Sequence, residues 1–219
     1  MRRMEHLMGI IVPLVTGRVL GGKDPQPGWL PRRLVTVLSG DVDVDAGCGA
    51  VWLVWRPWSS TAEPYTARVE HDGGHFRHIG AAGVAGGGAV PGRDVAAGRP
   101  AASEAGQAGM IELGGHSGGV SAAWRLQHHG PGTGAPWVGA SEVRVAAEVE
   151  HLLIGEQRRR VQVPGHGRVI VAWKSPNTIA GGIRPLIVAV GRDGSELSRL
   201  GPDDAMDTYT TAKLSGDLG

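Results

Sequence analysis

The sequence predicts a mostly β protein built from two lobes, and three observations carry this prediction. Short apolar runs rich in Val, Ile and Trp are separated by turn signals along most of the chain. Gly accounts for 37 of the 219 residues, which favours many turns over long helices. A faint internal repeat places Asp72-Gly73 and Asp193-Gly194 in similar surroundings, which indicates related hairpins in the two halves.

Composition excludes several classes of function. The formal net charge of +1 gives no strong field, so we expect neither a nucleic-acid partner nor an anionic membrane partner. No apolar run approaches the roughly 18 residues of a membrane helix, so no membrane span is expected. The single Cys48 excludes an internal disulfide and a Cys-based zinc cluster, and no metal or cofactor is expected. The excess of Arg over Lys fits a GC-rich coding sequence.

The first 18 residues are interpreted as a signal or pro segment. Arg2 and Arg3 precede the apolar stretch from Met8 to Val15, which is the order found in secretory signals. This stretch is short and contains Pro13, so an ordinary first strand or an N-terminal tail is the alternative. The expected location is secreted with a signal and cytoplasmic without one.

Residues 19–80 are assigned to an N-terminal β lobe. A strand is expected at 34–38, an acidic turn at 40–45 and an apolar strand at 51–55. Two alternating segments at 66–70 and 75–78 flank Asp72-Gly73-Gly74, which predicts a hairpin.

Residues 81–109 are of low complexity, with 8 Gly and 10 Ala among 29 residues. Such a segment buries too little side chain to offset its ordering entropy, so we interpret it as a flexible Gly/Ala-rich linker between the lobes. Residues 110–202 then form the C-terminal lobe, and 203–219 form a polar tail.

The C-terminal lobe begins with an apolar run at 110–113, followed by a glycine-rich turn at 114–119. Residues 120–127 fit a helix or a strand, and 143–154 have a helical composition although their first half alternates. A run of three Arg at 158–160 is interpreted as a solvated face. Strands are expected at 168–173 and 185–190.

Ser117 is the candidate nucleophile. It lies in Gly114-Gly115-His116-Ser117-Gly118-Gly119, which satisfies the Gly-x-Ser-x-Gly pattern of a nucleophile elbow. Flanking glycines permit a sharp turn and leave the hydroxyl uncrowded. The N–H groups of Gly115 and Ser117 are the candidate oxyanion donors.

Residues 16–31 resemble the activation site of trypsin-like serine proteases: a basic residue, two aliphatic residues, Gly-Gly, a polar pair and a Pro-Gly turn. Gly47-Cys48-Gly49-Ala50 resembles the segment that precedes the catalytic histidine in that family, so the resemblance covers mainly residues 16–50. It implies barrel-like β lobes, cleavage between Arg18 and Val19, and insertion of the new ammonium beside a buried carboxylate.

The resemblance also implies a catalytic triad, although this chain has Glu63-Pro64 where the family has its histidine. A histidine from the 71–78 hairpin, taken as His75, is the candidate base, and Asp94 or Asp72 is the candidate acid, Asp94 being preferred. His116 replaces the family's acid before the serine. A peptide or protein substrate is implied if the chain is active, and the oligomeric state is left open.

Three alternatives stay open beside a serine peptidase or a catalytically degenerate relative. One is a truncated α/β-hydrolase-like esterase with Ser117 at the elbow and Asp193 as acid, although no histidine follows His166. Another is a non-catalytic β binding protein in which Ser117 is a turn residue. The composition also fits a GC-rich gene read in an unselected frame.

Overall fold

The computed structural model describes residues 2–83, 99–102, 109–128, 134–176 and 182–217. These residues are mostly β, as the sequence predicts. The elements in chain order are α1 (Arg2–Leu20), β1 (Val35–Asp43), β2 (Cys48–Trp55), β3 (Glu63–Asp72), β4 (His75–Gly83), β5 (Ile111–Val120), α3 (Ala122–Gln127), β6 (Trp137–Val145), β7 (Val149–Ile154), β8 (Arg159–Gln162), β9 (Arg168–Ser175), β10 (Ile187–Gly191), β11 (Glu196–Leu200) and α4 (Thr208–Ser215).

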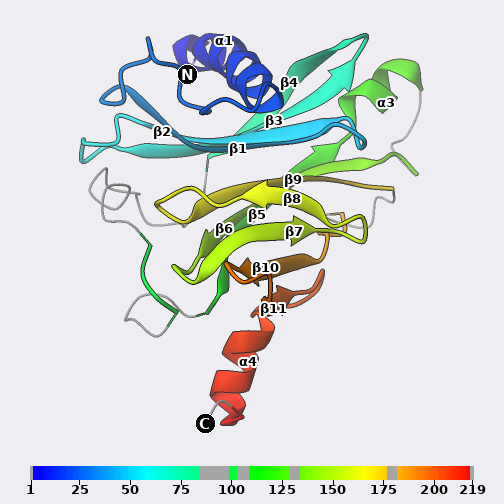
Figure 1. Cartoon of the computed structure of the whole chain (residues 1–219). Coiled ribbons are helices and arrows are strands. Elements are labelled where there is room, and N and C mark those ends of the chain that lie inside the picture. The colour runs from blue at the N-terminus through cyan, green and yellow to red at the C-terminus, as the bar shows by residue number, and fades with distance from the viewer. Residues whose placement is uncertain (1, 84–98, 103–108, 129–133, 177–181, 218–219) are drawn as a thin grey trace.

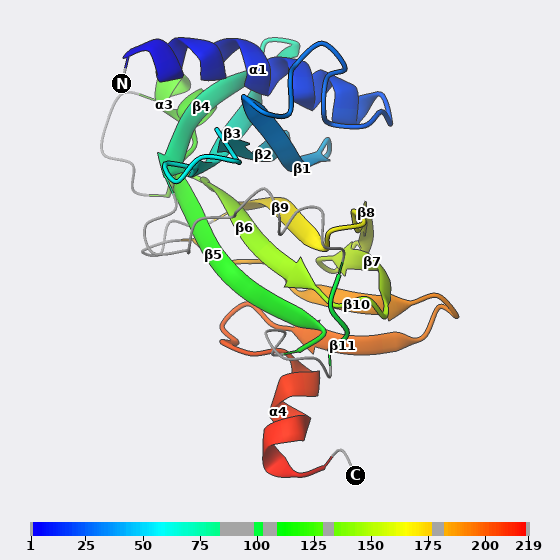
Figure 2. The same ribbon diagram turned by 90° about the vertical axis from the view of Figure 1, so that its left-hand side faces the viewer.

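The strands form three antiparallel sheets, ordered β1-β2-β3-β4, β5-β6-β9 and β11-β10-β7-β8. Helix α1 lies on the outer face of the first sheet, the other two sheets follow beneath it, and α4 extends from the opposite end (Figures 1 and 2). No sheet in the described residues closes into a barrel, so the barrel-like lobes implied by the family resemblance are wrong. Because each of these sheets is open, each has two edge strands.

Helix α1 occupies the N-terminus, so the alternative of an ordinary first strand is wrong, whereas a role of the first 18 residues as a signal or pro segment stays a prediction. Met8, Ile11, Val12 and Val15 are buried with the spacing of one helical face, and they pack on the first sheet. Thr16 on the same face donates its hydroxyl to the Val12 carbonyl. None of the helices in the described ranges combines the length and apolarity needed to cross a membrane.

Two further apolar clusters hold the sheets together. Leu38, Trp52 and Val54 of the first sheet pack against Val138 and Ile170 of the second. The opposite face of the second sheet packs on the third in the largest cluster, which includes Val143, Val171, Leu152, Ile187 and Leu200. Alternation along β6 and β9 explains this arrangement, because successive side chains of a strand face opposite sheets.

Several local predictions are confirmed. The expected strands at 51–55, 168–173 and 185–190 correspond to β2, β9 and β10. The hairpin at Asp72-Gly73-Gly74 joins β3 to β4, with positive φ angles of 59° at Gly73 and 97° at Gly74 that suit glycine. The second Asp-Gly turn joins β10 to β11, so both copies of the faint repeat are hairpins.

Other local predictions are wrong. Residues 40–43 belong to β1 and do not form an acidic turn. The glycine-rich stretch 114–119 lies inside β5, which is paired with β6 along its length. Residues 149–154, expected to be helical, form β7. Most of the predicted linker, 84–98 and 103–108, lies outside the described residues.

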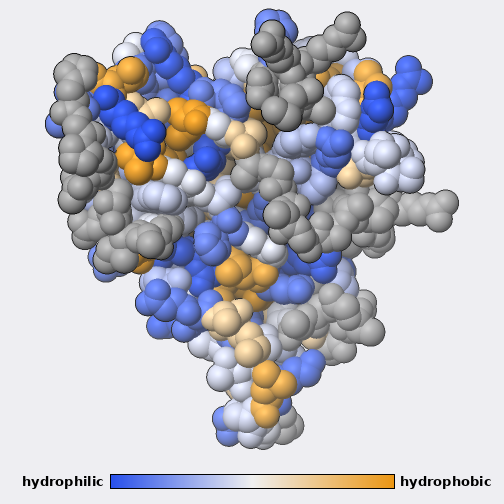
Figure 3. Space-filling view, turned by 180° about the vertical axis from the view of Figure 1, so that it is seen from behind, coloured by the Kyte–Doolittle hydropathy of each residue, from blue (hydrophilic) through white to orange (hydrophobic). Residues whose placement is uncertain are grey.

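Apolar side chains are distributed in separate groups over the face seen from behind (Figure 3). Exposed large apolar residues occur at several distant points of the chain, among them Trp29, Trp58 and Leu214. Isolated residues of this kind are ordinary on a protein surface, so they do not identify a functional surface.

Candidate functional site

Ser117 lies in the middle of β5, opposite Ala140 of β6, and not at a sharp turn. Packing explains the glycine at position 118 of this strand, because a Cβ there would collide with the Trp137 indole. The Ser117 hydroxyl oxygen is buried and has no hydrogen-bond partner among the described residues. A nucleophilic serine needs a base within hydrogen-bond reach, and none contacts this hydroxyl in the described part of the chain.

The other members of the predicted triad are not brought to Ser117 by the described residues. His75 is exposed at the start of β4, in the first sheet, where it borders a pocket with Thr16 and Leu20 of α1. Asp94 lies outside the described residues. Asp72, the second candidate acid, forms an ion pair with Arg77 at 3.4 Å. The triad therefore stays a prediction.

The predicted oxyanion donor Gly115 is paired with Glu142, which is 6% exposed. The Glu142 carboxylate accepts a hydrogen bond from the Thr66 hydroxyl, and burial raises the pKa of Glu142. A carboxyl group beside Gly115 opposes the binding of an oxyanion whenever that carboxyl is ionised.

The predicted cleavage site lies in the last turn of α1. The Arg18 guanidinium donates to the Asp24 carbonyl at 2.7 Å, and Val19 packs against the apolar cluster under the helix. Whether the chain is cut between Arg18 and Val19 stays a prediction.

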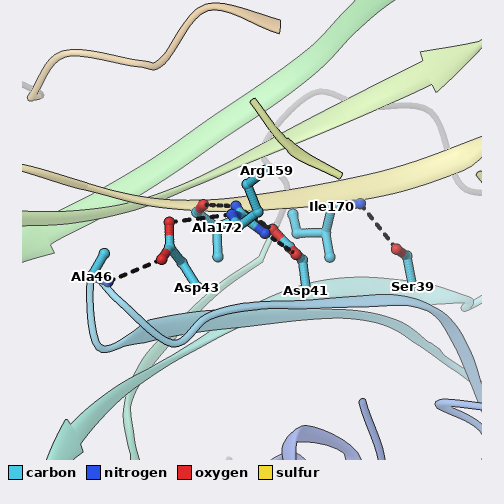
Figure 4. A network of polar contacts seen from close by, with 7 residues as sticks. All are labelled: Ser39, Asp41, Asp43, Ala46, Arg159, Ile170 and Ala172. Atoms are coloured by element: carbon cyan, nitrogen blue, oxygen red, sulfur yellow. Dashed lines mark hydrogen bonds and ion pairs between the residues drawn. The ribbon is translucent and has the colours of Figure 1, made fainter. Parts of the chain in front are cut away.

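A buried ion-pair network joins β1 to the other two sheets (Figure 4). The Arg159 guanidinium of β8 contacts both carboxylate oxygens of Asp41, the Nη2–Oδ2 distance being 3.0 Å, and it forms an ion pair with Asp43 at 3.2 Å. It also donates to the Ala172 carbonyl of β9 at 2.9 Å. The Asp41 and Arg159 side chains are 7% and 20% exposed, so solvent screens the pair little.

The same network fixes β1 against β9. Asp41 Oδ2 accepts from the Ala172 N–H at 2.8 Å, and the Ser39 hydroxyl accepts from the Ile170 N–H at 3.1 Å. These side chains therefore point toward β9, and the backbone of β1 is left to form the adjacent surface.

Cys48 lies at the end of the β1–β2 hairpin and is fully buried. Burial raises the pKa of its thiol to about 12, and the Asp43 and Asp41 carboxylates add to the shift. The thiol is therefore protonated at neutral pH, which disfavours it as a nucleophile. Within the described ranges, no three His, Cys, Asp or Glu side chains converge on a possible metal site.

A pocket of about 670 Å³ opens beside the network. Its wall is formed by the loop after α1, by the edge strand β1 and by the edge strand β8 with the loop that follows it; the lining residues include Lys23, Asp24, Arg32, Gly40, Asp41, Val42, Arg159, Arg160, Gln162 and His166. This volume is in the range of pockets that hold small molecules or short peptide segments.

The pocket lining is positively charged overall. Lys23, Arg32, Arg159 and Arg160 contribute four cations, whereas Asp24 and Asp41 contribute two anions. Arg159 is neutralised in the buried network, and Arg32 is 4.0 Å from Asp24. Lys23 and Arg160 are exposed, and neither forms an ion pair with another described residue. These two cations are therefore available to an anionic ligand.

His166 at the pocket wall is held in one orientation. Its Nδ1 accepts from the Arg168 N–H at 3.2 Å, and its ring also hydrogen-bonds the Leu38 backbone. Burial lowers the pKa of His166, and the positive charge of Arg168 lowers it further. The imidazole is therefore neutral at pH 7, with both nitrogens engaged, and it contributes shape to the pocket more than charge.

Comparison of the chain with protein-family models, curated proteins and solved structures found no match.

Sequence reasoning missed the pocket and its network. The sequence predicts a solvated face for Arg159 and a turn for Asp41, and both predictions are wrong, because Arg159 lies in the buried network and Asp41 lies in β1. A usable signal was present, since Ser39, Asp41 and Asp43 alternate within an otherwise apolar stretch and would share one face of a strand. The partner of Asp41 is 118 residues away, and nothing in the local sequence indicates that separation.

Proposed function

We propose that this protein is a non-catalytic β binding protein whose ligand is anionic and occupies the pocket between β1 and β8. The proposal rests on one observation: the pocket lining carries an excess of two positive charges, and Lys23 and Arg160 are exposed and form no ion pair with another described residue. The buried Asp41–Arg159 pair fixes the edge strands on both sides, so the pocket is largely formed before binding.

The chemistry of the pocket supports binding in preference to catalysis. Its histidine is neutral with both nitrogens engaged, and its buried carboxylate, Asp41, is bound to Arg159 and to the Ala172 N–H. No group in the described lining is placed as a nucleophile with an adjacent base. A cationic surface beside free strand edges can still hold a carboxylate-bearing ligand.

Combined replacement of Lys23→Ala and Arg160→Ala is expected to weaken binding of an acidic ligand about tenfold, since each exposed cation contributes about 0.5–1 kcal/mol. The probe is a fluorescein-labelled hexapeptide of alternating Glu and Val, measured by fluorescence anisotropy. Its affinity is also expected to fall when ionic strength rises from about 0.05 M to about 0.5 M.

The matched control is Arg125→Ala with Lys213→Ala, which removes the same two residue types from exposed positions on α3 and α4. It leaves net charge equal to that of the pocket variant, so a nonspecific charge effect would weaken both variants alike. Equal loss in the two variants, or failure of the wild-type chain to bind both this peptide and citrate, would contradict the proposed function.

The serine peptidase stays a prediction, and a fluorophosphonate probe separates it from the binding proposal. Because the Ser117 hydroxyl has no base among its described neighbours, we expect the wild-type chain and Ser117→Ala to react equally slowly. Labelling that Ser117→Ala abolishes, together with a mature chain beginning at Val19, would favour the peptidase instead.

A further inference from the structure

We infer that the ligand is an extended acidic polypeptide that pairs with the free edge of β1 as an added strand. This inference rests on the proposed function, because it names the class of anionic ligand that the pocket takes. Strand addition is a general mode of peptide recognition, in which backbone hydrogen bonds supply affinity and flanking side chains supply selectivity.

The pocket lies between two strand edges. Within the described residues, β1 pairs only with β2, and β8 pairs only with β7. Both strands line the pocket, β1 from Val37 to Val42 and β8 from Arg159 to Gln162. An edge strand carries a row of backbone N–H and C=O groups that can accept a further strand.

The upstream part of the β1 edge is already hydrogen-bonded by the side chain of Gln26. The Gln26 side-chain amide accepts from the Val37 N–H at 2.8 Å and donates to the Val35 carbonyl at 3.4 Å. Gln26 is 6% exposed and also donates to the Leu30 carbonyl at 2.9 Å, so the loop holds it in place. The backbone on this side of β1 is therefore oriented to pair with an amide group.

Downstream of Val37 the cover by Gln26 ends, the His166 ring hydrogen-bonds the Leu38 backbone, and the pocket borders the strand from there to Val42. Ser39 and Asp41 direct their side chains toward β9, and Gly40 has none. From Ser39 to Asp41, the wall that β1 offers to the pocket is therefore largely backbone, and Val37, Leu38 and Val42 complete the lining on this strand. Six residues, 37–42, border the pocket, and the four from 39 to 42 lie beyond the backbone groups that Gln26 and His166 engage, so part of a hexapeptide at about 3.3 Å per residue can pair there.

Charge then favours an acidic strand over a neutral or basic one. Lys23 lies in the loop beside β1, and Arg160 belongs to the lining of the opposite wall, so a strand in the pocket would lie near two cations that form no ion pair with another described residue. Alternate side chains of a strand share one face, so carboxylates at alternate positions of the bound strand would all point toward the same wall of the pocket.

The experiment compares three forms of the Glu-Val hexapeptide with the full chain. The first is unmodified, and the other two carry N-methyl groups on one set of alternate backbone amides or on the other set. N-methylation removes the donor and blocks the edge without changing charge. We expect one methylated form to bind at least about tenfold more weakly and the other to bind like the parent, since only one set of amides faces β1.

Hydrogen exchange measured with and without the parent peptide locates the strand. We expect slowed exchange within residues 38–42 of β1 and unchanged exchange in α4. Protection confined to 159–162 would overturn the assignment to β1. Equal affinity of the three peptides, with binding still reduced by Lys23→Ala and Arg160→Ala, would overturn strand addition while leaving the proposed function intact. Absence of binding by every peptide and by citrate, used as a small polyanion, would overturn the proposed function as well.

Discussion

The variant Arg159→Met is expected to lose about 3 kcal/mol of unfolding free energy, a large share of the stability of an ordinary domain. Removal of the guanidinium leaves the Asp41 carboxylate buried, with the Ala172 N–H as its remaining donor, and it removes the ion pair to Asp43. Met fills similar space, so the loss reports the unpaired charge more than a cavity. Guanidinium unfolding followed by tryptophan fluorescence measures the effect.

Arg160→Met is the matched control, because it places the same substitution on the neighbouring residue of β8, which is exposed. Its cost should be within about 0.5 kcal/mol. Adding Asp41→Asn to Arg159→Met should recover part of the lost stability, since a neutral amide still accepts from Ala172. Equal stability of the two single variants would refute the role assigned to the pair. A cooperative transition in the wild-type chain would also exclude an unselected reading frame.

Asp207→Ala is expected to cost about 3 kcal/mol and to release α4 from the sheets. Asp207 is fully buried and is the N-cap of α4, where it accepts from the Thr210 N–H at 2.9 Å. Its carboxylate also accepts from the Ile111 N–H at 2.8 Å and from the Ser198 hydroxyl at 2.9 Å. One side chain thus joins the helix to β5 and β11, and Ala would leave these donors without an acceptor.

The loss should appear both in the denaturation midpoint and in faster hydrogen exchange within residues 208–215. Asp207→Asn keeps one acceptor oxygen, so its cost should be smaller. Asp203→Ala removes an exposed carboxylate from the preceding loop and should change stability by less than about 0.5 kcal/mol. A cost at Asp203 equal to that at Asp207 would contradict the capping role.

Patterns that depend on neighbours in the sequence predicted much of the sheet structure. The apolar runs at 51–55, 168–173 and 185–190 became strands, and Asp72-Gly73-Gly74 became a hairpin turn, because the turn residues and the flanking alternation act locally.

Two local misreadings have a clear physical cause. The alternative of a first strand at the N-terminus is wrong because the stretch from Met8 to Val15 is apolar enough to fit several structures, and the sheet under it selects the helical face of Met8, Ile11, Val12 and Val15. The glycines around Ser117 suit a turn equally well, but Trp137 covers Gly118, and strand β6 supplies the backbone partners that make this stretch a strand.

The amino-acid sequence by itself determined that this protein is mostly β, where several of its strands lie and which residues turn the chain, since these follow from short-range alternation and turn chemistry. Only the tertiary structure decided that the strands form three open stacked sheets, that Asp41 meets Arg159, and that the edge strands β1 and β8 line one pocket together with Lys23 and Arg160. These contacts join residues more than a hundred positions apart, and their energy depends on burial, which no local stretch of sequence specifies.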